Sequence, residues 1–135
     1  MISTGIATIF VSDMDRSIEF YTKILGLRLT QRFGNHWAQV EAGRLTIGLH
    51  PASPQNTAGR NGSVTIGFVL SSPIDEAVQA LLAKGVKFRG PIAVDPNAGK
   101  FATFEDPDGN ALYIMEIVEW PQREESSKVE HWGAR

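Results

Sequence analysis

The feature that most constrains the fold is a pattern that occurs twice in the chain. Val11 and Leu70 each end a run of apolar and β-branched residues, and Gly26 and Gly85 each follow a stretch with helical spacing of apolar side chains; both pairs are 59 positions apart. A glycine directly after a helix favours the left-handed conformation that ends it. The sequence therefore predicts two modules of order β-α-β-β-β, in which a helix covers one face of each sheet.

The expected modules form a single domain over residues 1–117. Module one covers about residues 4–50, and module two covers about residues 63–117. Residues 51–62 between them are rich in proline, glycine, asparagine and serine, which is typical of a linker. Residues 118–135 form a predicted polar C-terminal tail.

Composition excludes several classes of function. The chain has 135 residues, no cysteine and a formal net charge of −2. Disulfides, thiol nucleophiles and thiolate zinc sites are therefore excluded, and no basic excess indicates nucleic-acid binding. No apolar run approaches the roughly 20 residues that a membrane span needs, and no signal peptide is recognisable at the N-terminus. We expect a cytoplasmic protein that contacts neither nucleic acid nor membrane.

A predicted hairpin, residues 36–41 and 44–49 with its turn at Ala42-Gly43, assigns the two faces of the first sheet. This register places Glu41 opposite Arg44, where the two side chains would form an ion pair. Alternation gives one face that is apolar throughout and is expected to pack on the helix, with Ala38, Val40, Leu45, Ile47 and Leu49. The opposite face is mixed and is expected to line a cavity.

The residues expected to line that cavity are largely aromatic, with a few hydroxyl, amide and imidazole groups. Such a lining is typical of a site for a small organic molecule. The predicted ligand-binding residues are Phe10, Trp37, Gln39, Thr46, His50, Thr65, Phe101, Tyr113 and Met115. Gly48 and Gly67 favour open space in this cavity, and the alternative is that the side chains themselves fill it.

Two motifs resemble a known family. The segment Val11–Tyr21 followed by Leu25-Gly26-Leu27, together with the turn Asp106–Asn110, resembles the vicinal oxygen chelate superfamily. This superfamily includes glyoxalase I, extradiol dioxygenases, fosfomycin-resistance transferases and bleomycin-resistance proteins. The resemblance implies an α+β fold in which two βαβββ modules form a half-open barrel around one cavity. It also implies a homodimer, with the pocket between subunits in the bleomycin-resistance branch.

The resemblance also implies where a divalent metal would be bound. The four ligand positions of the superfamily correspond to Ile6, Gly48, Thr65 and Tyr113, and none of them holds histidine or a carboxylate. Metal centres need several oxygen or nitrogen donors at fixed distances. We therefore expect no metal site and no cofactor.

Three functions follow from these observations. The first is a metal-free protein that binds a small aromatic or amphipathic molecule. The second is a metal-dependent lyase or dioxygenase with a displaced metal site, for which His50 and Tyr113 are the candidate catalytic residues. The third is a structural or regulatory module with a filled cavity. Whether the protein is an enzyme is left open by the sequence.

Overall fold

The computed structural model describes residues 1–60, 62, 64–97 and 99–117. In module one, strands hydrogen-bond in the order β1-β4-β3-β2, with β1 and β4 parallel. The elements of this module are β1 (Ala7–Val11), α1 (Met14–Glu19), the π-helical turn η1 (Phe20–Ile24), β2 (Arg28–Phe33), β3 (Trp37–Ala42) and β4 (Leu45–Pro51).

Module two repeats this architecture with one addition. Its strands pair in the order β5-β9-β8-β6, and β7 also pairs with β8. Its elements are β5 (Ile66–Val69), α2 (Ile74–Ala83), β6 (Lys87–Phe88), β7 (Ala93–Asp95), β8 (Gly99–Glu105) and β9 (Ala111–Ile117). Strand β7 follows proline and glycine residues that disfavour a strand, and its pairing with β8 rather than local propensity makes it one.

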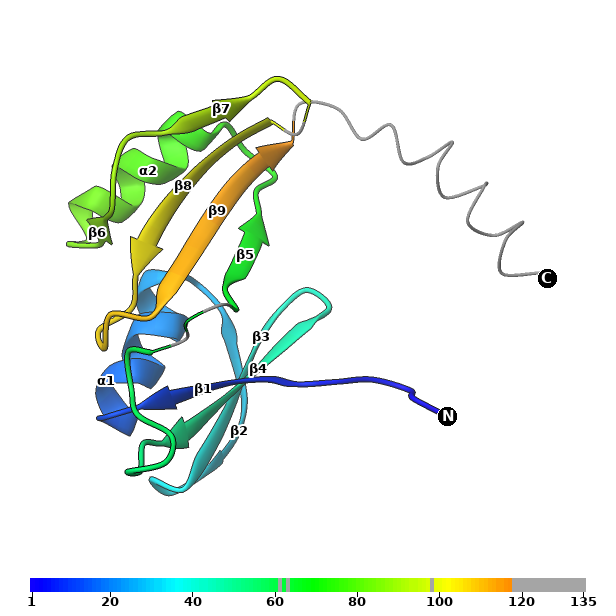
Figure 1. Ribbon diagram of the computed structural model, residues 1–135, viewed down its shortest axis with the longest axis vertical. Coiled ribbons are helices and arrows are strands. Elements are labelled where there is room, and N and C mark those ends of the chain that lie inside the picture. Colours follow the sequence, from blue (N-terminus) through cyan, green and yellow to red (C-terminus); the bar gives the residue numbers. More distant parts are fainter. Residues whose placement is uncertain (61, 63, 98, 118–135) are drawn as a thin grey trace.

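The two modules lie end to end, and both helices cover the same side of the molecule (Figure 1). Neither sheet closes on itself, so the fold is the expected α+β pair of βαβββ modules in a half-open barrel. The expected tail, residues 118–135, lies outside the described residues. In the described part of the chain, no helix has the length and apolar character needed to cross a membrane.

The predicted apolar face of the first sheet packs in the hydrophobic core. In module one, Ala38, Val40, Ile47 and Leu49 are fully buried in the hydrophobic core. In module two, the matching core residues are Phe104, Leu112 and Ile114. Alternation along each strand therefore turns the remaining side chains away from the helices.

The turn of the β3–β4 hairpin lies one position further along the chain than we predicted, which shifts the register of the two strands by two residues. The register pairs Ala42 with Leu45 and Glu41 with Thr46, so the turn residues are Gly43 and Arg44. Gly43 has a positive φ of 57°, which suits the first position of a tight hairpin turn. A shift of two leaves every side chain on its predicted face, but the expected Glu41–Arg44 ion pair is wrong: Arg28 donates to Glu41 instead, at 3.2 Å.

The two helices are capped by different means. Asp13 caps α1, because its carboxylate accepts a hydrogen bond from the Arg16 backbone N–H at 3.0 Å. At the start of α2, Pro73 offers no capping side chain. The Ile74 N–H donates instead to Glu116 Oε1 on β9, at 2.7 Å. Glu116 therefore points to the helix side of the sheet, away from the opposite face.

A buried polar contact joins the two modules. The Tyr21 hydroxyl donates to Asp106 Oδ2 at 2.8 Å, and both residues are buried. In the same turn, Asp108 accepts hydrogen bonds from the backbone N–H and the hydroxyl of Ser12. Burial, followed by the negative charge of Asp106, raises the pKa of Tyr21 well above its usual value of 10.0. The two motifs that carry the family resemblance therefore bind each other, which fixes module two against the β1–α1 junction of module one.

Candidate functional site

Side chains on the helix-free side of module one form a mixed surface, which we call the first face. Its residues alternate with the buried core residues of the same strands. The predicted ligand-binding residues on it are Phe10, Trp37, Gln39, Thr46 and His50.

An aromatic row crosses the first face. Phe10 aligns with His50 between β1 and β4, and their ring centroids are 5.6 Å apart in an edge arrangement. The His50 ring also meets the Trp37 ring edge-on at 6.2 Å. Phe33 on β2 aligns with Trp37, so the row extends to the edge of the sheet. The row therefore presents four ring side chains from four adjacent strands.

Our sequence interpretation missed Phe33, which is 60% exposed. The register between β2 and β3 shifts between Leu29 and Gln31, so simple alternation could not place it. The ring side chains Phe33, His36 and Trp37 gather around the β2–β3 turn, and this clustering is the signal that could have found it.

The Trp37 ring depends on the absence of a side chain at position 48. A Cβ atom built on Gly48 would lie 2.2 Å from the Trp37 ring. Only glycine therefore permits the indole to lie flat against β4. The indole N–H donates to Gln39 Oε1 at 3.0 Å, which fixes both side chains.

The equivalent surface of module two, which we call the second face, is more apolar. Its predicted ligand-binding residues are Thr65, Phe101, Tyr113 and Met115. The Tyr113 ring lies against Gly67, where a Cβ atom would come within 2.1 Å of it. The Thr65 hydroxyl donates to the Ala111 carbonyl at 2.8 Å and is thus engaged within the module.

The nine predicted residues therefore fall into two groups on different sheets. Strand registers make Trp37 equivalent to Phe101, and His50 equivalent to Met115. The first face combines aromatic rings with imidazole and amide groups, while the second offers aromatic, thioether and phenol groups. Thr46 pairs with Glu41 near the hairpin end, away from the aromatic row.

The residues at the implied metal positions do not fit a metal. Ile6 and Gly48 have no side-chain donor atom, and the Trp37 ring occupies the space over Gly48. The Thr65 hydroxyl is engaged with Ala111, which leaves Tyr113 as the remaining donor. Across the described ranges, no group of three or more His, Asp or Glu side chains is placed to hold an ion. We derive no chemistry through a metal from this arrangement.

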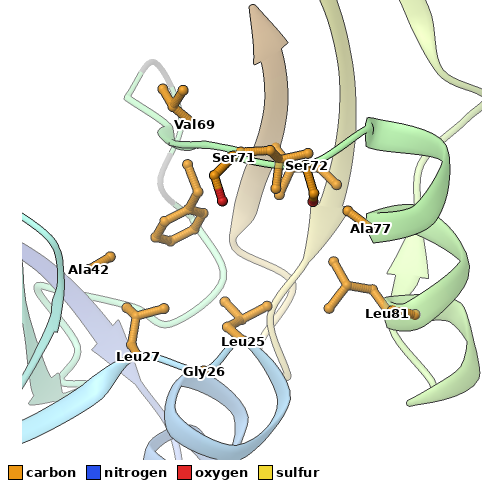
Figure 2. Close-up of a pocket in the computed structure, with 13 residues that line it drawn as sticks. Leu25, Gly26, Leu27, Ala42, Val69, Ser71, Ser72, Ala77 and Leu81 are labelled. Atoms are coloured by element: carbon orange, nitrogen blue, oxygen red, sulfur yellow. The ribbon is translucent and has the colours of Figure 1, made fainter.

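A groove that the sequence did not reveal separates the two modules on the helix side (Figure 2). Its volume is about 380 Å³. Leu25 and Leu27 lie on one side of it, and Ser71, Ser72 and residues of α2 lie on the other. The lining contains no charged side chain.

The repeat explains why this groove exists. Tyr21 and Leu81 each lie seven residues after the first residue of their helix. In the strand registers, the pair Glu41–Thr46 of module one takes the same place as the pair Glu105–Ala111 of module two. Ala42 follows Glu41 as Asp106 follows Glu105, so Ala42 is the equivalent of Asp106. One junction between the modules is thus filled by the Tyr21–Asp106 contact. The other carries the smaller side chains Leu81 and Ala42, both of which line the groove.

Comparison with known proteins agrees with this architecture. Residues 4–114 match the model of the Glyoxalase/Bleomycin resistance protein/Dioxygenase superfamily. The virulence protein STM3117 of Salmonella typhimurium is 30% identical over 115 residues, which cover 80% of this chain and 79% of that protein.

Solved structures with the same fold include proteins of different function. TnmS3, an antibiotic binding protein from Streptomyces sp. CB03234, is 24% identical, with a TM-score of 0.71 over 87% of this chain and 97% of its own. A lactoylglutathione lyase from Agrobacterium tumefaciens is 18% identical, with a TM-score of 0.69 over 84% of this chain and 92% of its own. At these identities the likeness concerns the fold alone.

Proposed function

Because the chain belongs to the Glyoxalase/Bleomycin resistance protein/Dioxygenase superfamily, we propose that it binds a small, flat, amphipathic aromatic molecule without a metal. The aromatic row of the first face carries this proposal. Flat ligands stack on or pack edge-on against aromatic rings, and each such pair contributes roughly 0.5–1.5 kcal/mol beyond burial of area. The rings at the centres of both faces are held against glycines, so little side-chain freedom is lost on binding.

A second copy of the chain completes the site in this proposal. Small-molecule pockets bury about 70–90% of a ligand, whereas each face in the single chain is one wall. The edge strand β2 is exposed along its length and carries Leu29 and Phe33 at its surface. Uncovered edges of this kind favour association. The first face of one protomer would lie opposite the second face of its partner, which gives two equivalent sites in a homodimer.

Proteins with this fold include both a binding protein and a lyase, so the choice between binding and a reaction depends on the residues of the two faces. TnmS3 is described as an antibiotic binding protein, and it shares this fold. The alternative, a lyase or dioxygenase with a displaced metal site, would need His50 and Tyr113 to meet at one ion. Even where the two faces meet in the dimer, these residues supply one imidazole and one phenol, and neither has a carboxylate partner among the contacts of the described residues.

The proposal is tested by thermal unfolding of the purified protein in EDTA with a panel of planar phenols, hydroxynaphthalenes and quinones. A ligand at 100 times its Kd should raise the free energy of unfolding by about 2.7 kcal/mol. The stabilisation should be lost in Trp37→Ala and retained in Leu82→Ala, a matched control on the exposed surface of α2. Stabilisation that requires an added divalent ion would contradict the proposal and favour the enzyme.

Sedimentation equilibrium tests the dimer. We expect a mass of about twice 14.8 kDa. A monomer that nevertheless binds ligand would show that one face is sufficient.

A further inference from the structure

The polar groups of the first face have fixed hydrogen-bonding roles. His50 Nδ1 lies 2.8 Å from the Pro51 carbonyl oxygen. A carbonyl oxygen can only accept, so Nδ1 carries a proton. In the neutral ring, Nε2 is then an acceptor, and no contact occupies it among the described residues.

The orientation of Gln39 is fixed by the same reasoning. An indole N–H can only donate, so the Gln39 atom 3.0 Å from Trp37 Nε1 is the amide oxygen. The Gln39 amide nitrogen takes no part in this contact and offers two N–H donors. Within the described part of the chain, no side-chain contact of this nitrogen is found.

These two groups are neighbours on the sheet. Gln39 aligns with Gly48, and His50 lies two residues further along β4. Diagonal neighbours of this kind have Cα atoms roughly 7–8 Å apart. Trp37 contacts both, through its ring edge to His50 and through its N–H to Gln39. The first face thus presents one acceptor and one donor beside a row of aromatic rings.

We infer that the ligand of the first face is an aromatic compound with a hydroxyl or N–H donor directed at His50 Nε2 and a carbonyl-type acceptor directed at Gln39 Nε2. This inference rests on the proposed function and specifies its ligand class. A hydroxyaryl ketone, ester or quinone with its two polar groups at separate edges of fused rings has this arrangement. An aryl carboxylate or a plain hydrocarbon does not, because neither donates to the imidazole.

A matched set of probes tests the inference by calorimetry at about pH 8.5: methyl 6-hydroxy-2-naphthoate, its 6-methoxy analogue and 2-naphthol. We expect the hydroxy ester to bind about tenfold more tightly than the methoxy ester, because the methoxy group leaves Nε2 without a donor. We expect 2-naphthol, which lacks the acceptor, to lose a similar factor.

Two variants assign each preference to its residue. His50→Phe keeps an aromatic ring and should abolish the preference for hydroxyl over methoxy. Gln39→Leu should abolish the preference for the ester over 2-naphthol while leaving the hydroxyl preference intact. Equal binding of the hydroxy and methoxy esters to the unmodified protein would overturn the inference and leave the proposed function standing. Failure of every probe to bind would contradict the proposed function, and this inference with it.

The tautomer of His50 is measurable without any ligand. Long-range ¹H–¹⁵N NMR of the free protein at the same pH should show His50 protonated at Nδ1, with Nε2 as the unprotonated nitrogen. His36 and His131 provide internal references in the same spectrum. A His50 ring protonated at Nε2 would overturn the inference, since the face would then offer two donors.

Discussion

Replacing Tyr21 by Phe tests the contact that joins the two modules. The change removes one hydroxyl from a buried site and leaves the ring in place. Asp106 keeps three other donors, the backbone N–H groups of Asp108 and Asn110 at 3.0 and 2.8 Å and the Asn110 amide at 2.9 Å. A hydrogen bond to a charged group contributes about 1.5–3 kcal/mol. Because the carboxylate stays largely satisfied, we expect a loss near the lower end, about 1.5 kcal/mol, in urea unfolding at pH 7.

The same substitution predicts a specific pH dependence. The pKa of Tyr21 is raised in the folded protein, so the unfolded chain ionises first as the pH rises. This contribution to stability is complete below about pH 10 and is lost above it, by up to about 1.4 kcal/mol per pH unit. The free energy of unfolding of Tyr21→Phe should lack this component. The difference between the two proteins should therefore shrink between about pH 10 and 11.

Tyr113 provides the matched control, because it is the second of the two tyrosines in the chain. It lies on the second face, and its hydroxyl makes no hydrogen bond to any of the described residues. Tyr113→Phe should change the free energy of unfolding by less than about 0.5 kcal/mol. If Tyr21→Phe were equally harmless, or if both variants showed the same pH dependence, the reasoning about the Tyr21–Asp106 contact would be refuted.

Three further substitutions test other parts of the structure. Gly48→Ala should displace the Trp37 ring, which would alter the near-ultraviolet circular dichroism spectrum and weaken binding of the naphthoate probe. An unchanged spectrum would show that the ring does not lie over position 48. Ser17→Ala removes a buried hydroxyl that has no partner among the described residues, so the free energy of unfolding should stay equal or rise by up to about 1 kcal/mol. A decrease of that size would show that the Ser17 hydroxyl does make a hydrogen bond. Glu116→Gln removes a charge at the start of α2 and should lower the free energy of unfolding in urea by about 0.3–1 kcal/mol, less at high salt. The same decrease at all salt concentrations would contradict the electrostatic explanation.

Sequence reasoning succeeded where local patterns determine the outcome. The glycine stops and the alternation of β3 and β4 follow from rules that act over a few residues. Because strand alternation has a period of two, even the misplaced hairpin turn left the faces correctly assigned.

The features that were missed arise from contacts between distant parts of the chain. Glu116 reaches the start of α2 across 42 positions, and Tyr21 reaches Asp106 across 85. Phe33 joins the aromatic row through a strand pair with an irregular register. The groove exists because Ala42 and Leu81 stand where the other junction has Asp106 and Tyr21, a comparison that requires the aligned modules.

The most direct test of metal-independent binding on the first face is isothermal titration of methyl 6-hydroxy-2-naphthoate into the protein in EDTA. We expect one molecule bound per chain, a Kd that is unchanged when Mn²⁺ or Ni²⁺ replaces EDTA, and loss of binding in Trp37→Ala. Binding that appears only with the metal, or that survives in Trp37→Ala, would contradict it.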